Sequence, residues 1–283
     1  MRSAILVWTK ISQSTIPANA LNHVQKAWDS PVTASVYQKL LADSHNLPID
    51  AARLRAVASG HAGDWLHAAP ITAVRLRLSN EAIRVAVGHR LGSMTFQPHT
   101  CICGVSVDAK DLHGPSGRKS SSRQIRHAQP NDIVWRAVKK AHYPAVKEPV
   151  RLSRSDGKRP DGATLIPWTS GKPVAWDVTV SDTCANSYIA DTATTASAAA
   201  NRAADNKTAK YQELAKTHQF APIVIETGGA WNEKVVEFIS EVGRRITEVT
   251  NEQLKTMFLF QRISVALQRG NAIAFRNTFP SEH

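Results

Sequence analysis

The sequence predicts a mixed α/β protein in which a helical region precedes a region with a sheet. Three observations carry this prediction. In the first hundred residues, apolar side chains recur every three or four positions, as in amphipathic helices. Short strand-like runs with turn residues between them follow at 147–180. An Ala-rich helical stretch then leads to another apolar run at 220–229. A strand meander that continues into a helix and a further strand is typical of an α/β arrangement.

The first 96 residues are expected to be helical and connector-like. Four segments have the helical period, with Pro or Gly at their edges: 18–30, 34–44, 48–60 and 79–92. Ser79 or Asn80 would be the N-cap of the fourth. Residues 97–128 have no sustained period and are rich in Ser, Gly, Arg and Cys, so a loop-rich region is expected there.

Residues 129–283 are expected to form the α/β domain. It would begin with a short helix capped by Asn131. The remaining expected elements, in chain order, are strands at 147–155, 157–168 and 172–180, a helix at 188–217, a strand at 220–229, a helix at 232–250 and one or two helices within 251–277.

The charge of the chain favours an anionic partner. The 283 residues carry a net charge of +12, and residues 101–160 hold 13 Lys and Arg against 5 Asp and Glu. A basic block of this kind suits a phosphate backbone, and a solvated surface without a specific ligand is the alternative.

The sequence has no run of 18 apolar residues, so no membrane span is expected. Its three cysteines favour a reducing compartment over a disulfide framework.

Two acids stand out in the predicted hairpin at 159–180. Asp161 follows Pro160, and Asp177 lies between Trp176 and Val178 in the most apolar part of the next strand. A hairpin that turns at 169–172 brings the two acids close together. Because neighbouring carboxylates repel each other, a cation between them is expected. Oxygen ligands suit Mg²⁺ or Mn²⁺, which can activate water and stabilise charge on a phosphate.

Two lysines in the following helix are candidates for the same site. Lys207 and Lys210 are three residues apart and lie on similar faces of that helix. A lysine near a scissile phosphate can orient water or neutralise developing charge. The alternative is structural: Asp161 would cap a bulge, Asp177 would pair with a core arginine, and the lysines would be solvated.

The order of these motifs resembles a known nuclease family. RPD (159–161), then DVTV (177–180), then a helix with K-x-x-K-Y (207–211) is similar to the restriction-enzyme-like endonuclease of site-specific non-LTR retrotransposons, a branch of the PD-(D/E)xK superfamily. The resemblance implies a PD-(D/E)xK core of helix, three-strand meander, helix and strand. It implies that Asp161 and Asp177 bind the metal and that Lys207 or Lys210 is catalytic, with Lys210 marginally preferred. The usual lysine position, two residues after the second acid, is Thr179.

The resemblance extends upstream to a zinc knuckle. Cys101, Cys103 and His113 correspond to three of its ligands, and Gly117 stands where the fourth, a Cys, is expected. Zinc binding and a decayed knuckle without zinc are both open, and His99 or His127 could fill the fourth place.

Further residues are assigned on the same resemblance. Arg126 and His127 match an Arg-His pair expected to contact nucleic acid, and Lys158 and Arg159 are further candidates for that contact. Glu226, at the end of the strand that precedes Gly228 and Gly229, could lie near the metal. Glu148 could be a supporting acid or part of a surface salt bridge.

The implied activity is metal-dependent nicking of DNA in the nucleus. The partner would be DNA and possibly the element's RNA, with no membrane involved. The alternative is an inactive nucleic-acid-binding relic of such a nuclease, because Gly117 and the long interval from Asp177 to the lysines depart from the family pattern. A helical interaction module whose α/β half is only structural is a third reading.

Overall fold

The computed structural model describes residues 2–18, 24–94, 96–110, 120–152 and 157–279, and only the backbone of residues 120–123. Its main sheet has four strands in the order β3 (Ala145–Lys147), β4 (Gly162–Thr164), β5 (Val174–Ser181) and β6 (Gln219–Glu226). The first three form an antiparallel meander, and β6 runs parallel to β5. The mixed α/β class predicted from the sequence is confirmed.

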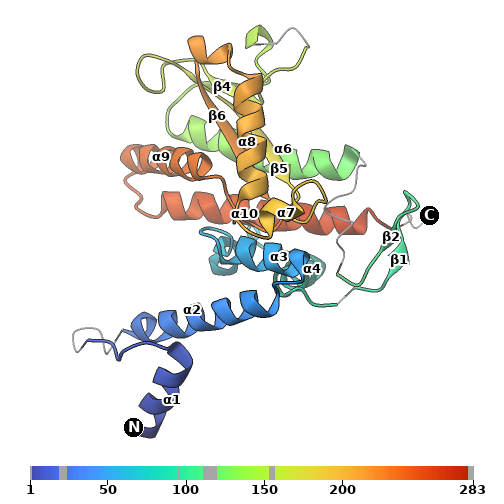
Figure 1. Cartoon of the computed structure of the whole chain (residues 1–283). Coiled ribbons are helices and arrows are strands. Elements are labelled where there is room, and N and C mark those ends of the chain that lie inside the picture. Colours follow the sequence, from blue (N-terminus) through green and yellow to red (C-terminus); the bar gives the residue numbers. More distant parts are fainter. Residues whose placement is uncertain (1, 19–23, 95, 111–119, 153–156, 280–283) are drawn as a thin grey trace.

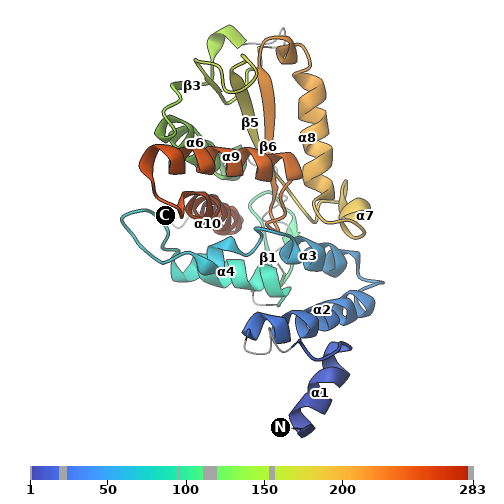
Figure 2. The same ribbon diagram turned by 90° about the vertical axis from the view of Figure 1, so that its left-hand side faces the viewer.

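Helices cover both faces of this sheet (Figures 1 and 2). α6 (Ser120–Lys140) and α9 (Glu233–Thr250) lie on one face, whereas α8 (Ala198–Lys210) lies on the other. The crossover from β5 to the parallel strand β6 contains α8 and the short helix α7 (Ile189–Thr192). α10 (Lys255–Arg276) packs against α6 and α9.

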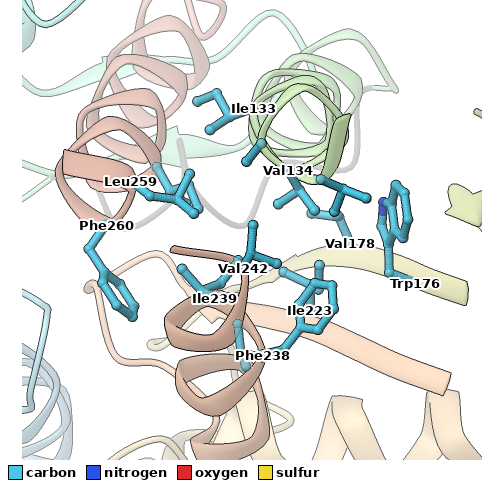
Figure 3. Packing of buried hydrophobic residues seen from close by; sticks show 14 of the residues in the cluster. Ile133, Val134, Trp176, Val178, Ile223, Phe238, Ile239, Val242, Leu259 and Phe260 are labelled. Atoms are coloured by element: carbon cyan, nitrogen blue, oxygen red, sulfur yellow. The ribbon is translucent and has the colours of Figure 1, made fainter. Parts of the chain in front are cut away.

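The main core lies between the sheet and the helices α6, α9 and α10 (Figure 3). Trp176 and Val178 of β5 and Ile223 and Ile225 of β6 are buried in this core. Successive side chains of a strand point to opposite faces of the sheet. Asp177, between Trp176 and Val178, is therefore turned toward the face that α8 covers. The alternation of side chains along β5 therefore places the Asp177 carboxylate on the opposite face of the sheet from the main core.

The region before residue 97 consists of α1 (Arg2–Ser12), α2 (Gln25–Asp43), α3 (Pro48–Ala58), the 3-10 turn η2 (Asp64–His67) and α4 (Asn80–Leu91). Within it, η2 and α4 pack against α10, and Trp65, Val85 and Phe96 share an apolar cluster with Val265 and Phe275. The predicted boundary at residue 96 therefore falls inside a shared core. By contrast, α1 and α2 extend away from this core (Figure 1), and α2 has no buried residue.

Some predicted helix ends are confirmed and others are wrong. Ser79 is the N-cap of α4, since its side chain accepts a hydrogen bond from the Ala82 N–H. α6 begins at Ser120, however, so Asn131 lies inside the helix and is not its cap. Its Oδ1 accepts a hydrogen bond from the buried Trp176 indole at 3.0 Å. The segments expected as helices at 18–30 and 34–44 are joined across Pro31 in α2.

Other segments also differ from the prediction. The single helix expected at 188–217 is divided into α7, α8 and a 3-10 turn, η4 (Leu214–Lys216). Ser197, just before α8, has a left-handed backbone (φ 63°) that an uninterrupted helix would not tolerate. β3 (Ala145–Lys147) overlaps the strand expected at 147–155 only at Lys147, and η3 (Val150–Leu152) follows Pro149. β1 (His99–Thr100) and β2 (Ser106–Val107) form a small hairpin in the region expected to be loop-rich.

None of the helices that the structure describes combines the length and apolarity that crossing a membrane requires.

Candidate active site

Asp161 and Asp177 lie side by side, Asp177 within β5 and Asp161 just before the neighbouring strand β4. Asp161 directly precedes β4, and its backbone N–H donates to the Trp176 carbonyl at 2.9 Å. Its Oδ2 accepts the Val178 N–H at 2.6 Å. The bonds of Asp161 therefore go to the residues on either side of Asp177. The structure brings together the two acids that the sequence singled out.

A lysine from α8 completes this pair. The ammonium of Lys207 forms an ion pair with Oδ1 of Asp177. The Asp177 side chain is 8% exposed and that of Lys207 is 24% exposed, so the pair is largely shielded from water. The hydroxyl of Tyr211, in the next turn of chain, is also hydrogen-bonded to Asp177. The alternative expectation, a core arginine as the partner of Asp177, is not what the structure has.

Burial and neighbouring charges act on Asp177 in opposite directions. Burial is the largest influence and raises the pKa of Asp177, because a carboxylate loses its hydration there. The Lys207 ammonium lowers this pKa, and the Asp161 carboxylate raises it again. The outcome is a pKa above the usual value for Asp. The two carboxylates repel each other, and the Lys207 ammonium offsets only part of this repulsion. A further cation bound between them would reduce the repulsion that remains.

His127 of α6 is the second neighbour of the acid pair. Its Nε2 lies 2.8 Å from Oδ2 of Asp161. This hydrogen bond is the largest influence on the ring and raises the pKa of His127, while burial opposes it. The sequence nominated His127 for contact with nucleic acid and did not anticipate its bond to Asp161. His127 lies in α6 because this helix begins eleven residues before the expected start, and that extension had no strong sequence signal.

The choice between the two lysines falls on Lys207. Lys210 lies three residues further along α8 and is exposed, whereas Lys207 contacts Asp177. The marginal preference for Lys210 is therefore not supported. Thr179, where the resemblance would place a lysine, is half-buried in β5. The lysine that contacts Asp177 therefore comes from α8 and not from β5.

Glu226 does not join this site. In the parallel register of β5 and β6, Asp177 is paired with Pro222, whereas Glu226 is paired with Ser181. Four residues of strand amount to about 13 Å. Glu226 is buried, and its Oε1 accepts the Ala200 N–H at 3.1 Å. The prediction that it shares a metal with Asp161 and Asp177 is wrong, because it lies at the far end of β6.

Of the basic residues nominated for nucleic acid, Arg126 is misplaced. It is 4% exposed, and its side chain packs against Gly270 of α10. A buried guanidinium is not available to a phosphate at the surface. Lys158 and Arg159 are exposed beside Asp161, and Arg159 forms an ion pair with Glu148. Glu148 is thus in a surface salt bridge, one of the two roles open to it.

The predicted zinc ligands are only partly described. Cys101 is buried in the β1–β2 hairpin and Cys103 is exposed in its turn, while His113 lies outside the described residues. His99 and His127, which could have replaced the missing fourth zinc ligand, both have other contacts in the structure. The ring nitrogens of His99 lie 3.0 Å from the Gln97 carbonyl and 2.8 Å from Oγ1 of Thr278, and His127 is bound to Asp161. Zinc binding stays a prediction.

The donor set at Asp161 and Asp177 fits a hard divalent cation. Mg²⁺ keeps several water ligands and is commonly held by one or two carboxylates together with substrate phosphates. One carboxylate in β5 and one just before β4 meet that requirement. Among the described residues, no group of three or more His, Cys, Asp or Glu is placed to hold a metal by itself. The fit is to an ion that shares its ligands with water and substrate.

Comparisons with known proteins do not assign the chain to a family. No protein-family model matches the chain, and no curated protein matches it. The case for a function rests on the residues around Asp177.

Proposed function

We propose that the chain is a metal-dependent DNA endonuclease that hydrolyses one strand at a time, derived from a non-LTR retrotransposon. The observation that carries the proposal is the ion pair between Lys207 and Asp177 beside Asp161. Two acids and a lysine on a meander-helix-strand sheet are the elements that the PD-(D/E)xK resemblance implies. Burial raises the pKa of Asp177, and perturbed acids of this kind are common at functional sites.

Each residue has a distinct role in phosphodiester hydrolysis. Asp161 and Asp177 would hold Mg²⁺ or Mn²⁺, which when bound supplies an activated water and neutralises charge at the scissile phosphate. Lys207 donates hydrogen bonds to a phosphate oxygen as negative charge develops there. The Val178 N–H and His127 both bond to Oδ2 of Asp161, so they hold this carboxylate in one orientation. Positioning by such neighbours is worth much in a site that works by geometry.

The choice of substrate rests on charge and on the resemblance. A net charge of +12 suits a polyanion. The preference for DNA over element RNA and the nuclear location come from the retrotransposon family. A metal held by Asp161 and Asp177 with Lys207 beside it suits any phosphodiester, so the substrate arms of the experiment are DNA and RNA.

The test is nicking of supercoiled plasmid by the purified chain with Mg²⁺ or Mn²⁺. We expect conversion to the open circle with either metal and none when EDTA is added. Asp177→Asn should abolish nicking, because it removes one metal ligand and the partner of Lys207. Asp205→Asn is the matched control, since Asp205 is an exposed acid on the same helix as Lys207.

Two outcomes would overturn the proposal. Nicking that survives in Asp177→Asn would show that these acids are not the site. Intact plasmid in every arm, together with a gel shift that weakens as salt rises, would favour the inactive relic.

A further inference from the structure

A second basic surface lies on another face of α6. A groove of 770 Å³ is bounded by the segment 72–77, by α6 and by α10. Five arginines line it: Arg75, Arg77, Arg136, Arg262 and Arg269. Among the residues described, Asp132 is the only acid in its lining. None of these arginines was singled out by the sequence, because they come from three distant segments.

The positive charge of the groove is largely unneutralised. Asp132 is shared between two cations, with its Oδ2 2.7 Å from Nε of Arg136 and its Oδ1 2.6 Å from Nζ of Lys147. Within the described ranges, Arg75, Arg77 and Arg262 form no ion pair. A concave surface with several cations and one already occupied acid concentrates anions from solution.

Burial makes the excess positive charge of the groove more costly in free energy. Arg262 and Arg269 are half-buried in the groove. Burial is the main cause of a lowered pKa for Arg262, and Arg136 and Arg75 lower it further. Burial and then Arg75 act in the same way on Arg269. Because arginine stays protonated in proteins, the groove keeps these charges, and an anion would stabilise them.

A structural role explains only part of the cluster. Arg269 donates to the carbonyls of Arg75 and Arg77, at 3.0 and 3.2 Å. These bonds fix the 72–77 segment against α10. They leave the guanidinium groups of Arg75 and Arg77 exposed, so the same bonds hold the wall of the groove in place for a ligand.

The dimensions favour a chain of phosphates over a single anion. Arg262 and Arg269 are seven residues apart on α10, about 10 Å, which is the rise of about three nucleotides along one strand of B-DNA. The groove volume lies in the range that holds ligands much larger than one phosphate. Ala128 and Gln129 line the groove and follow His127 along α6, so one helix carries part of the groove lining and the residue bound to Asp161.

We propose that this arginine groove binds the phosphate backbone of nucleic acid on the flank of the strand held at Asp161 and Asp177. The inference rests on the proposed function for its second half, the alignment with the acid pair. The groove itself is carried by its five arginines and one shared acid.

The test measures binding apart from cleavage. Fluorescence anisotropy of a short labelled DNA duplex is followed in EDTA over a series of salt concentrations. Arg75→Gln/Arg77→Gln removes two groove charges from exposed side chains and leaves the carbonyls that Arg269 contacts. Lys26→Gln/Lys39→Gln removes two exposed charges from α2 as the matched control. We expect the groove variant to bind more weakly and to flatten the log-log salt slope by about 1.8, which is 0.9 for each lost phosphate contact. The control should keep the wild-type slope.

The possible results separate this inference from the proposed function. Equal affinities and slopes for the groove variant and wild type overturn the groove, even when wild type nicks plasmid. A weakened groove variant supports the groove even when no protein nicks plasmid, and then the proposed function alone fails. Vesicles of phosphatidylcholine and phosphatidylserine form a second arm. Loss of vesicle binding with unchanged DNA binding would assign the groove to a membrane surface and overturn the inference.

Discussion

Replacing Lys207 tests the site most sharply, because α8 offers its own control. Lys207→Gln removes the ammonium from Asp177 but keeps a hydrogen-bond donor, and Lys210→Gln makes the same change on an exposed side chain three residues away. Removing one charge-stabilising donor from an active site costs about 10²- to 10³-fold in rate. We expect a loss of that size for Lys207→Gln and a rate within about twofold of wild type for Lys210→Gln, measured by plasmid nicking with Mg²⁺.

The same pair of variants has a second, independent readout in stability. Breaking a buried ion pair by removing one partner costs about 3–5 kcal/mol. Since Lys207 is 24% exposed and glutamine still donates, we expect about 3 kcal/mol, or roughly 6–12 °C in Tm. The deficit should shrink at acidic pH, because Asp177 is then protonated and needs no cation. Equal Tm values for the two variants would refute the ion pair, and loss of nicking in Lys210→Gln alone would refute the choice of lysine.

Two further predictions concern the support of the acid pair. In Gly162→Ala the new Cβ would lie 2.2 Å from Cζ2 of the fully buried Trp176. We therefore expect urea titration to show a loss of about 1–3 kcal/mol in the free energy of unfolding. Gly60→Ala is the control and should show no such loss, because a Cβ there would have no atom within 4 Å. The bond to Asp161 raises the pKa of His127, so its contribution to stability is complete below the unfolded value of about 6.5 and is lost as pH rises through the raised folded pKa. His127→Gln should therefore lower Tm more at acidic than at alkaline pH, and a deficit that grows with pH would contradict the bond.

The sequence predicted the acids well because strand alternation depends only on local pattern. Asp177 between Trp176 and Val178 has to be on the face opposite the main core, and the hairpin brings Asp161 beside it. The lysine was harder to choose. Which of Lys207 and Lys210 faces the sheet depends on where α8 begins, and that start follows the left-handed turn at Ser197. No periodicity in the sequence encodes that turn.

The errors at Arg126 and Glu226 have a related cause. Arg126 and His127 are adjacent in sequence, but on a helix adjacent residues point about 100° apart, so only one of them can face the acids. Both residues lie on a helix because α6 extends back to Ser120, whereas the sequence suggested a start at Asn131. Packing against α10 then takes Arg126 away from the acids. Glu226 lies on the same face of the sheet as Asp177 but four residues further along the paired strands. A face can be predicted from alternation, whereas a position along the strand depends on the register.

The placement of the acids explains how groups from both faces of the sheet reach one point. His127 comes from α6, on the core face, and Lys207 comes from α8, on the opposite face. A continuous strand would separate them, but β4 begins only at Gly162, so Asp161 stands at its open end. Buried ion pairs contribute little net stability, and apolar residues of similar volume often do as well or better. A pair such as Lys207 with Asp177 is therefore poorly explained by stability alone. On the proposed function, the pair is kept because Asp177 lies inside β5 next to Asp161 at the open end of β4, where a metal and a phosphate would be held.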